Sequence, residues 1–302
     1  MSETARRRAE RAQAWAALTL ATPAALLLVL LVLGPLLGVA VISLTDWQLG
    51  ARSLAFVGLG NYAELVEDRL FWISFANTLI YTGVVVPVSF ALGLLIAILI
   101  EAHPSLRTAY RLSFFLPVAA TVVAMALVWE FLLHPTLGPV NLLLRDGGWE
   151  GASWLHDRAT VLWTLCVIGI WLKLGYYVIL FIAGLKAIPR ELYEAAEIDG
   201  ASGAWTQFSM ITWPLLAPVS LFVLVIAFIQ SIQVFETVLV LTQGGPNKSS
   251  EVLLHTLYQE GFAYFRVGYA AALTVIFLAL VLLATVVKMR VIEPRVHAAR
   301  AR

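Results

Sequence analysis

Long apolar stretches separated by short polar segments dominate this sequence. Six of them reach the roughly 20 mostly apolar residues that a helix needs to cross a membrane. They cover about 15–44, 72–100, 108–133, 159–185, 214–241 and 267–289. No segment between them is long enough for a soluble domain, and no internal repeat is evident. The pattern predicts an all-α, polytopic membrane protein with six transmembrane helices.

The first apolar stretch follows four arginines between positions 6 and 11, as the core of a signal peptide would. Its apolar part is much longer than the roughly 7–15 residues of such a core, so we expect an uncleaved span. The predicted organisation is an N-terminal tail (1–14), a six-span domain (15–290) and a C-terminal tail (291–302).

The distribution of Lys and Arg predicts which loops face the cytoplasm, where both residues are enriched. With both termini cytoplasmic, the inner segments hold 13 of the 20 Lys and Arg residues and the outer segments hold 6, while Lys173 lies inside a span. The outer loops are then 45–71, 134–158 and 242–266, with turns expected at Gly147-Gly148 and at "QGGPNKSS".

Composition agrees with a membrane protein and excludes several other classes. The chain is 61% hydrophobic and 13% charged, against about 45–50% and about 25% in soluble domains. A net charge of +1 provides no field for binding nucleic acid. A single cysteine excludes an intrachain disulfide, and five widely separated histidines give no metal-site spacing, so we predict no metal.

The segment 187–213, between the fourth and fifth spans, carries four carboxylates in a cytoplasmic position. We expect Pro189 to occupy the first position of a short helix, which Asp199-Gly200 ends because glycine readily takes positive φ. A second short amphipathic helix should follow and end at Pro214, where the fifth span begins.

The helix in this segment could be a linker that packs only on lipid. Such linkers usually present Lys or Arg to the membrane surface. This helix presents Glu191 and Glu194, which the anionic inner leaflet repels, and Ala195 and Ala196 permit close approach of another chain. These features favour a protein partner with basic residues.

The same residues resemble the EAA motif of permease subunits in binding-protein-dependent ABC importers. The family pattern is Glu-Ala-Ala, three residues, Gly, about nine residues, then Ile-x-Leu-Pro. Here Glu194-Ala195-Ala196 is followed by three residues, Gly200, ten residues and Ile211-Thr212-Trp213-Pro214. The sequence departs from the pattern by one extra residue after Gly200 and by Trp213 in place of Leu.

Other stretches resemble the carbohydrate branch of this family, specifically its first permease subunit, of the maltose or glycerol-phosphate type. They are "FVGLGNYAEL" (56–65) with "FWISFANTLIYT" (71–82), "VFETVLVLTQGGPNKSSEVL" (234–253) and "LYQEGFAYFRVGYAAALTVI" (257–276). The resemblance covers nearly the whole chain after about residue 15.

The resemblance implies a type I ABC importer permease fold in a bacterial plasma membrane. The partners would be a second, non-identical permease, two ATPase subunits, an extracytoplasmic solute-binding protein and membrane lipid. The chain would be a transport subunit, not an enzyme, and would bind no cofactor, with ATP and Mg on the ATPase; consistently, it has no G-x-x-x-x-G-K-[ST] loop. The residues that would couple it to the ATPase are Glu191, Glu194, Ala195, Ala196, Asp199 and Gly200.

Polar and aromatic residues inside the third, fourth and fifth spans are candidates for the substrate path, because charges within spans are costly and usually functional. Gln230, Gln233 and Glu236 recur every three residues and could share one face of the fifth span. The full candidate set is Trp129, Glu130, Trp171, Lys173, Tyr176, Tyr177, Gln230, Gln233 and Glu236.

Structural roles remain open for each candidate. Glu130 could extend to the interface, Lys173 and Glu236 could form a buried ion pair, and the glutamines could join helices. The aromatics could serve packing or an interface belt, and Asn77 could form an interhelical hydrogen bond.

Three other functions fit the sequence less well than carbohydrate import. An ion-gradient-driven transporter usually shows internal repeats, and a membrane enzyme needs a clustered catalytic set; the sequence shows neither. An importer of amino acids, phosphonate or oxyanions is less well matched by the Gly-Gly-Pro loop. We therefore predict the permease subunit of an importer for a sugar, glycoside or polyol derivative, with an anionic substrate suggested by Lys173.

Overall fold

The structure is a computed structural model and describes residues 3–52, 54–102, 110, 113–114, 118, 120–201 and 203–291. The described residues are mostly helical; their single β pairing is a bridge between Thr45 and Phe56. Two compact units contain them, one from Met1–Glu67 with Gln259–Ile276 and one from Asp68–Tyr258 with Phe277–Arg302. The all-α prediction is confirmed.

The first unit contains a long N-terminal helical run, a short helix and a segment that begins the last helix. The run consists of α1 (Glu3–Leu28), a π-helical turn η1 (Val29–Leu33) and α2 (Gly34–Ile42). Then follow α3 (Gly60–Glu67), the π-helical turn η4 (Gln259–Ala263) and the start of α14 (Val267–Val291). The Asn61 side chain donates hydrogen bonds of 2.8 Å to the carbonyls of Ser43 and Thr45, which fixes α3 against the end of α2.

The second unit contains the bundle that carries both candidate sites. Its elements are α4 (Arg69–Ala102), α6 (Val122–Leu132), α7 (Pro139–Asp146), α8 (Val161–Lys186), α9 (Arg190–Ile198), α10 (Ala204–Gln207), the π-helical turn η3 (Phe208–Thr212), α11 (Trp213–Ile232), α12 (Glu236–Leu241) and α13 (Leu253–Tyr258), followed by the rest of α14.

Small residues let α8 pack closely on α4 and α11. A Cβ atom at Gly184 would lie 2.7 Å from Leu216 Cδ1, and one at Gly93 would lie 3.1 Å from the Cβ of Tyr177. Tyr177 and Phe181 are fully buried between these helices. Close approach at small residues is the usual source of helix association in a membrane, where lipid removes the hydrophobic driving force.

The predicted spans agree with the structure at three positions and differ at two. The second, fourth and sixth coincide with α4, α8 and α14 within three residues at each end. The third is described only as α6, of 11 residues, because much of 108–121 lies outside the described residues. The fifth is not continuous, since α11 ends at Ile232 and α12 begins at Glu236. Five helical runs of the described residues are long and apolar enough to cross a membrane.

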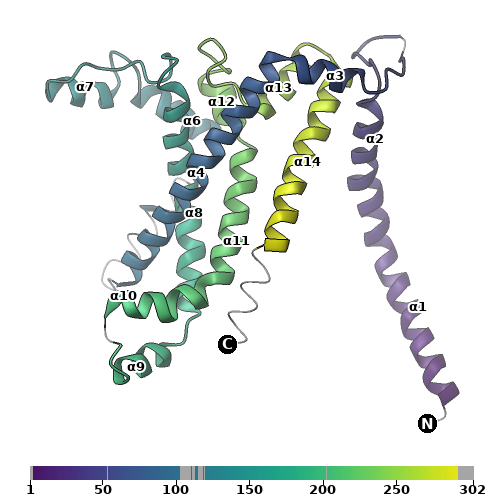
Figure 1. Cartoon of the computed structure of the whole chain (residues 1–302), viewed down its shortest axis with the longest axis vertical. Coiled ribbons are helices and arrows are strands. Elements are labelled where there is room, and N and C mark those ends of the chain that lie inside the picture. Colours follow the sequence, from purple (N-terminus) through teal and green to yellow (C-terminus); the bar gives the residue numbers. More distant parts are fainter. Residues whose placement is uncertain are drawn as a thin grey trace. The chain divides into compact units, whose positions relative to one another are not determined.

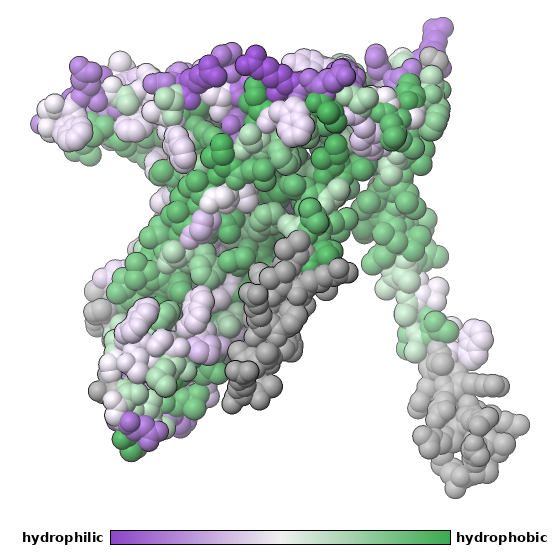
Figure 2. All heavy atoms as spheres, viewed as in Figure 1, coloured by the Kyte–Doolittle hydropathy of each residue, from purple (hydrophilic) through white to green (hydrophobic). Residues whose placement is uncertain are grey.

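The second unit presents polar groups at two opposite ends. Helices α9 and α10 lie at one end of the α4–α8–α11 bundle, and α12 and α13 lie at the other (Figure 1). Apolar residues cover the bundle between these ends (Figure 2). The predicted cytoplasmic helix and the first part of the predicted outer loop (242–258) therefore lie at opposite ends of this unit.

Candidate functional site: a charged hairpin and a polar cavity

Helix α9 carries the candidate coupling residues. It begins at Arg190, so Pro189 precedes the helix as its N-cap and the prediction that Pro189 is the first helical residue is wrong. The reason is the extended backbone of Pro189, with ψ of 135°. Glu191 lies in the first turn, where the helix dipole favours its charge.

A glycine ends α9 in the way the sequence predicts. Gly200 has φ of +83°, and no atom lies within 4 Å of the position its Cβ would take, so only its backbone conformation requires glycine. The Ala201 amide donates to the Ala196 carbonyl at 2.8 Å, and the Gly200 amide donates to the Glu197 carbonyl at 3.1 Å. These two bonds form a Schellman motif and complete the helix end.

The second helix of this segment is not a separate element. α10 continues through η3 into α11 without a break, which corrects the prediction of a distinct short helix before Pro214. A π-helical turn contains one residue more than an α-helical turn. Because η3 lies between Gly200 and Pro214, it is where the extra residue of this sequence fits.

Two side-chain contacts hold α9 against this continuous helix. The hydroxyls of Tyr193 and Thr212 are 2.9 Å apart, and the Gln207 amide donates to Glu197 at 3.4 Å. A groove of about 490 Å³ lies between the helices, and Ala195, Ala196 and Asp199 line its α9 side.

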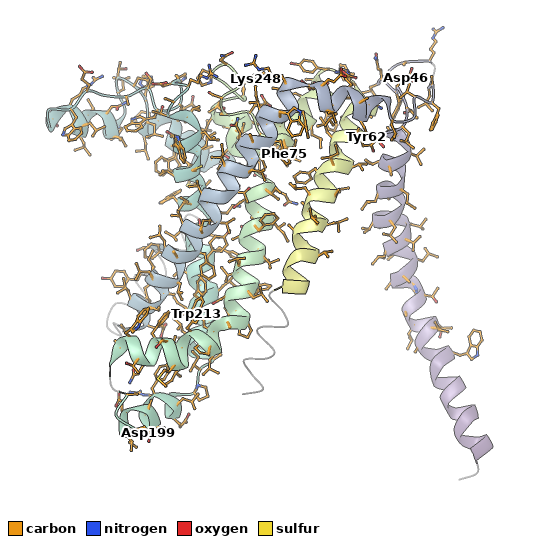
Figure 3. All side chains as sticks on the ribbon, viewed as in Figure 1. Asp46, Tyr62, Phe75, Asp199, Trp213 and Lys248 are labelled. Carbon is orange, nitrogen blue, oxygen red and sulfur yellow. The ribbon has the colours of Figure 1, made fainter. Side chains whose placement is uncertain are left out.

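The outer surface of α9 is exposed and carries an apolar residue among carboxylates. Glu191, Glu194, Ala195, Asp199 and Gly200 are exposed, and Ala196 is partly buried. Ile198 has 87% of its surface exposed, and Asp199 lies at the tip of the hairpin (Figure 3). Glu194 forms an ion pair with Arg190 at 3.5 Å, with both side chains exposed. Ile198 and the carboxylates thus share one exposed surface at the end of the bundle.

A polar cavity of about 240 Å³ lies within the bundle and gathers four of the candidate substrate-path residues. They are Lys173 from α8, Gln230 from α11, Gln233 from the break between α11 and α12, and Glu236 from the start of α12. The break, and not a continuous helical face, brings the last two beside the others. Helices interrupted next to a polar site are common in transporters.

Opposite charges and amides face each other in this cavity. Lys173 and Glu236 both line it but form no direct ion pair within the described part of the chain. The Tyr177 hydroxyl donates to Gln230 Oε1 at 3.3 Å, which orients that amide. Tyr81 and Thr237 also line the cavity; nothing in the sequence distinguishes them from ordinary packing residues of a span.

The other candidates lie outside this cavity. Trp129 and Trp171 form an edge-to-face pair with ring centroids 5.5 Å apart, and Trp129 lines a separate, apolar cavity of about 350 Å³. Tyr176 lies against Tyr177, with centroids 6.0 Å apart, and Glu130 is exposed. The cavity therefore contains four of the five non-aromatic candidates, all except Glu130.

A buried ionic cluster lies at the α12–α13 end and was not predicted from the sequence. Glu251 is fully buried and accepts hydrogen bonds from His255 at 2.5 Å, Lys248 at 3.1 Å and Thr256 at 3.1 Å. Burial raises the pKa of the Glu251 carboxyl, but the hydrogen bond from His255 and the charges of His255 and Lys248 outweigh it and hold that pKa below its usual value. Lys248 lies at the surface of this end (Figure 3).

Asn77 connects α4 to the Gly-Gly-Pro loop between α12 and α13. Its amide donates to the backbone carbonyls of Ser249 and Glu251 at 3.2 and 2.9 Å. The predicted interhelical hydrogen bond is thus one between a helix and the Gly-Gly-Pro loop. Among the described residues, no group of three or more His, Cys, Asp or Glu side chains could hold a metal ion.

A bundle of apolar helices with an internal polar cavity and an exposed charged hairpin at one end is the arrangement expected of a permease, the membrane subunit of a transport system. A family model described as "Binding-protein-dependent transport system inner membrane component" matches residues 89–298. The chain belongs to this family, as its EAA-like motif predicted.

Two curated relatives support the assignment. The chain is 32% identical over 280 residues to the sulfoquinovosyl glycerol transport system permease protein SmoG of Agrobacterium fabrum, covering 92% of this chain and 91% of that protein. It is 33% identical over 245 residues to the sn-glycerol-3-phosphate transport system permease protein UgpA of the same organism, covering 80% and 82%.

A solved structure shares the fold. A chain from the crystal structure of a bacterial alginate ABC transporter, in complex with an alginate pentasaccharide-bound periplasmic protein, superposes with a TM-score of 0.80 at 23% identity, covering 94% of this chain and 97% of that one. The prediction of an ABC importer permease fold is confirmed.

Proposed function

We propose that this chain forms, with a second and non-identical permease, the path by which a carbohydrate or polyol derivative enters a bacterial cell. A solute-binding protein delivers the solute at the α12–α13 end, and two ATPase subunits bind at the α9 end. The observation that carries this proposal is the polar cavity of Lys173, Gln230, Gln233 and Glu236 inside an apolar bundle. Amide, carboxylate and ammonium groups can replace the water around the hydroxyls of a solute.

The solute in this proposal carries an acidic group as well as hydroxyls. Sulfoquinovosyl glycerol, sn-glycerol 3-phosphate and alginate, the compounds in the names of the related systems, all have both. Lys173 supplies a cation in the cavity, and Glu236 supplies an acceptor for hydroxyls. This pairing suits a solute that is anionic at one position and polyhydroxylated elsewhere.

Replacing Lys173 tests whether the transported solute carries an acidic group that this side chain binds. Lys173→Ala in the assembled importer should reduce uptake of sn-glycerol 3-phosphate far more than uptake of neutral glycerol glycosides. Lys186→Ala, at the exposed end of the same helix, serves as the control and should change neither. Equal losses for the anionic and neutral solutes would reject the proposed role of Lys173.

The exposed face of α9 supports coupling to an ATPase. Glu191, Glu194 and Asp199 provide negative charge, Ile198 provides an apolar contact, and the Schellman turn at Gly200 fixes the tip. Movement of an ATPase bound there would reach the bundle directly, because α10, η3 and α11 are one continuous helix.

A charge reversal on α9 tests this contact. Glu194→Lys should leave membrane insertion intact but separate ATP hydrolysis from uptake, since it places a cation where a basic partner surface is expected. Glu150→Lys, an exposed position in the α7–α8 loop, is the matched control. Normal coupling in Glu194→Lys would refute the electrostatic contact.

A further inference from the structure

Tyr81 is the least expected residue of the polar cavity. It lies on α4, is only 5% exposed, and packs in the cluster that includes Val85 and Leu165. It also lines the cavity together with Lys173 and Gln230. Within the part of the chain that the structure describes, no hydrogen bond engages its hydroxyl.

A glycine on the neighbouring helix leaves the space that the Tyr81 hydroxyl occupies. A Cβ atom at Gly169, on α8, would overlap the hydroxyl of Tyr81. Gly169 itself lines the cavity. The ring of Tyr81 therefore reaches the backbone of α8 only because residue 169 has no side chain, and the hydroxyl stays at the cavity wall.

Tyr177, the second tyrosine near the cavity, differs from Tyr81 because its hydroxyl has a hydrogen-bond partner. The Tyr177 hydroxyl is engaged by Gln230 Oε1 at 3.3 Å, which leaves the amide nitrogen of Gln230 for other partners at the cavity. Tyr81 and Gln230 thus offer a hydroxyl and an amide in one small space. The Tyr81 hydroxyl faces the cavity, where water can bond to it, and a solute hydroxyl would take the place of that water.

We propose that Tyr81 determines specificity for one hydroxyl of the transported solute, in a position that Gly169 keeps open. The inference rests on the proposed function, because it needs a polyhydroxylated solute in this cavity. It adds a residue on α4 to a site otherwise built from α6, α8, α11, α12 and the break between the last two. A site that bonds one neutral hydroxyl should discriminate modestly against an analogue that lacks it.

The test combines a residue change with a solute change. Uptake by the assembled importer is measured for sn-glycerol 3-phosphate, a glycerol glycoside and an oligouronate, and then for each monodeoxy analogue of the solute that the wild type carries best. The wild-type importer should take up one monodeoxy analogue about 3- to 10-fold less well than the parent solute, a range typical of the loss of one neutral hydrogen bond. Tyr81→Phe should abolish that discrimination and leave the others unchanged. The binding protein's own preference is common to both variants and cancels in the comparison.

Two glycine variants provide a second readout. Gly169→Ala should displace the hydroxyl and reproduce the Tyr81→Phe pattern, whereas Gly83→Ala, on α4 with no atom within 4 Å of its added Cβ, should behave as wild type. The same discrimination pattern in Tyr81→Phe and in wild type would overturn the role of Tyr81. A wild-type importer that carries none of the three solute classes would instead refute the proposed function.

Discussion

The buried carboxylate of Glu251 gives the sharpest prediction about stability. Glu251→Gln keeps the shape of the side chain but removes the charge that holds the α12–α13 end together. The variant loses the charge-assisted bond with His255, in which both side chains have 0% exposure, and the bond with Lys248, whose side chain is 44% exposed. Asn77 still holds the backbone carbonyl of residue 251 from α4.

The magnitude follows from these contacts. A hydrogen bond to a buried charge contributes about 1.5–3 kcal/mol, and the exposed side of Lys248 makes its ion pair weaker, at most about 1 kcal/mol. A total loss of about 3 kcal/mol is therefore expected. At about 2–3 °C per kcal/mol for a chain of this size, Tm should fall by about 6–9 °C.

Thermal unfolding of the purified importer in detergent measures this effect. Glu150→Gln, at an exposed position in another loop, is the matched control and should change Tm by less than about 2 °C, as surface substitutions usually do. A Glu251→Gln variant with the Tm of the control would show that the cluster contributes nothing to stability, contrary to its burial and short distances.

Three further predictions concern packing, pH and coupling. Gly184→Ala should lower Tm by a few degrees, since its Cβ would lie 2.7 Å from Leu216 Cδ1 and overpacking costs about 1–3 kcal/mol, whereas Gly83→Ala should not lower it; similar Tm values would refute the close contact. The folded-state pKa of Glu251 is depressed, so the stability that its charge contributes should be complete above the unfolded pKa of about 4.3 and decline as pH falls through the lower folded pKa. A plot of Tm against pH should show this decline in the wild type and not in Glu251→Gln. Gly200→Ala should cost about 1 kcal/mol at its positive φ and raise the ATP hydrolysed per solute carried; an unchanged ratio would count against a coupling role for this turn.

The sequence predicted continuous spans well and predicted the broken one badly. The stretch Ser231–Thr237 contains neither glycine nor proline, so no local signal marks the break. The structure supplies the reason, because Phe235 leaves the helix and packs against Tyr258, with ring centroids 5.2 Å apart. That contact joins residues on either side of a loop, and hydrophobic periodicity contains no information about it.

In the candidate sites too, some residues could be predicted from the sequence and others could not. Lys173 and Glu236 stand out as charges in apolar runs, and Gly200 stands out by its place after the Glu-Ala-Ala triplet, so composition and motif find them. Tyr81 looks like an ordinary packing residue until Gly169, 88 positions later, is seen to admit its hydroxyl. Residues whose role depends on a distant glycine are found only in three dimensions.

The most direct test of the central claim is purification of this chain from its native membrane, with mass spectrometry of the proteins that accompany it. A permease subunit of an importer should bring a second membrane-spanning permease, an ATPase with a phosphate-binding loop and a solute-binding protein, and the solute held by that binding protein should carry hydroxyls and an acidic group. Recovery of the chain alone, or only with copies of itself, together with uptake driven by an ion gradient without ATP, would contradict the account.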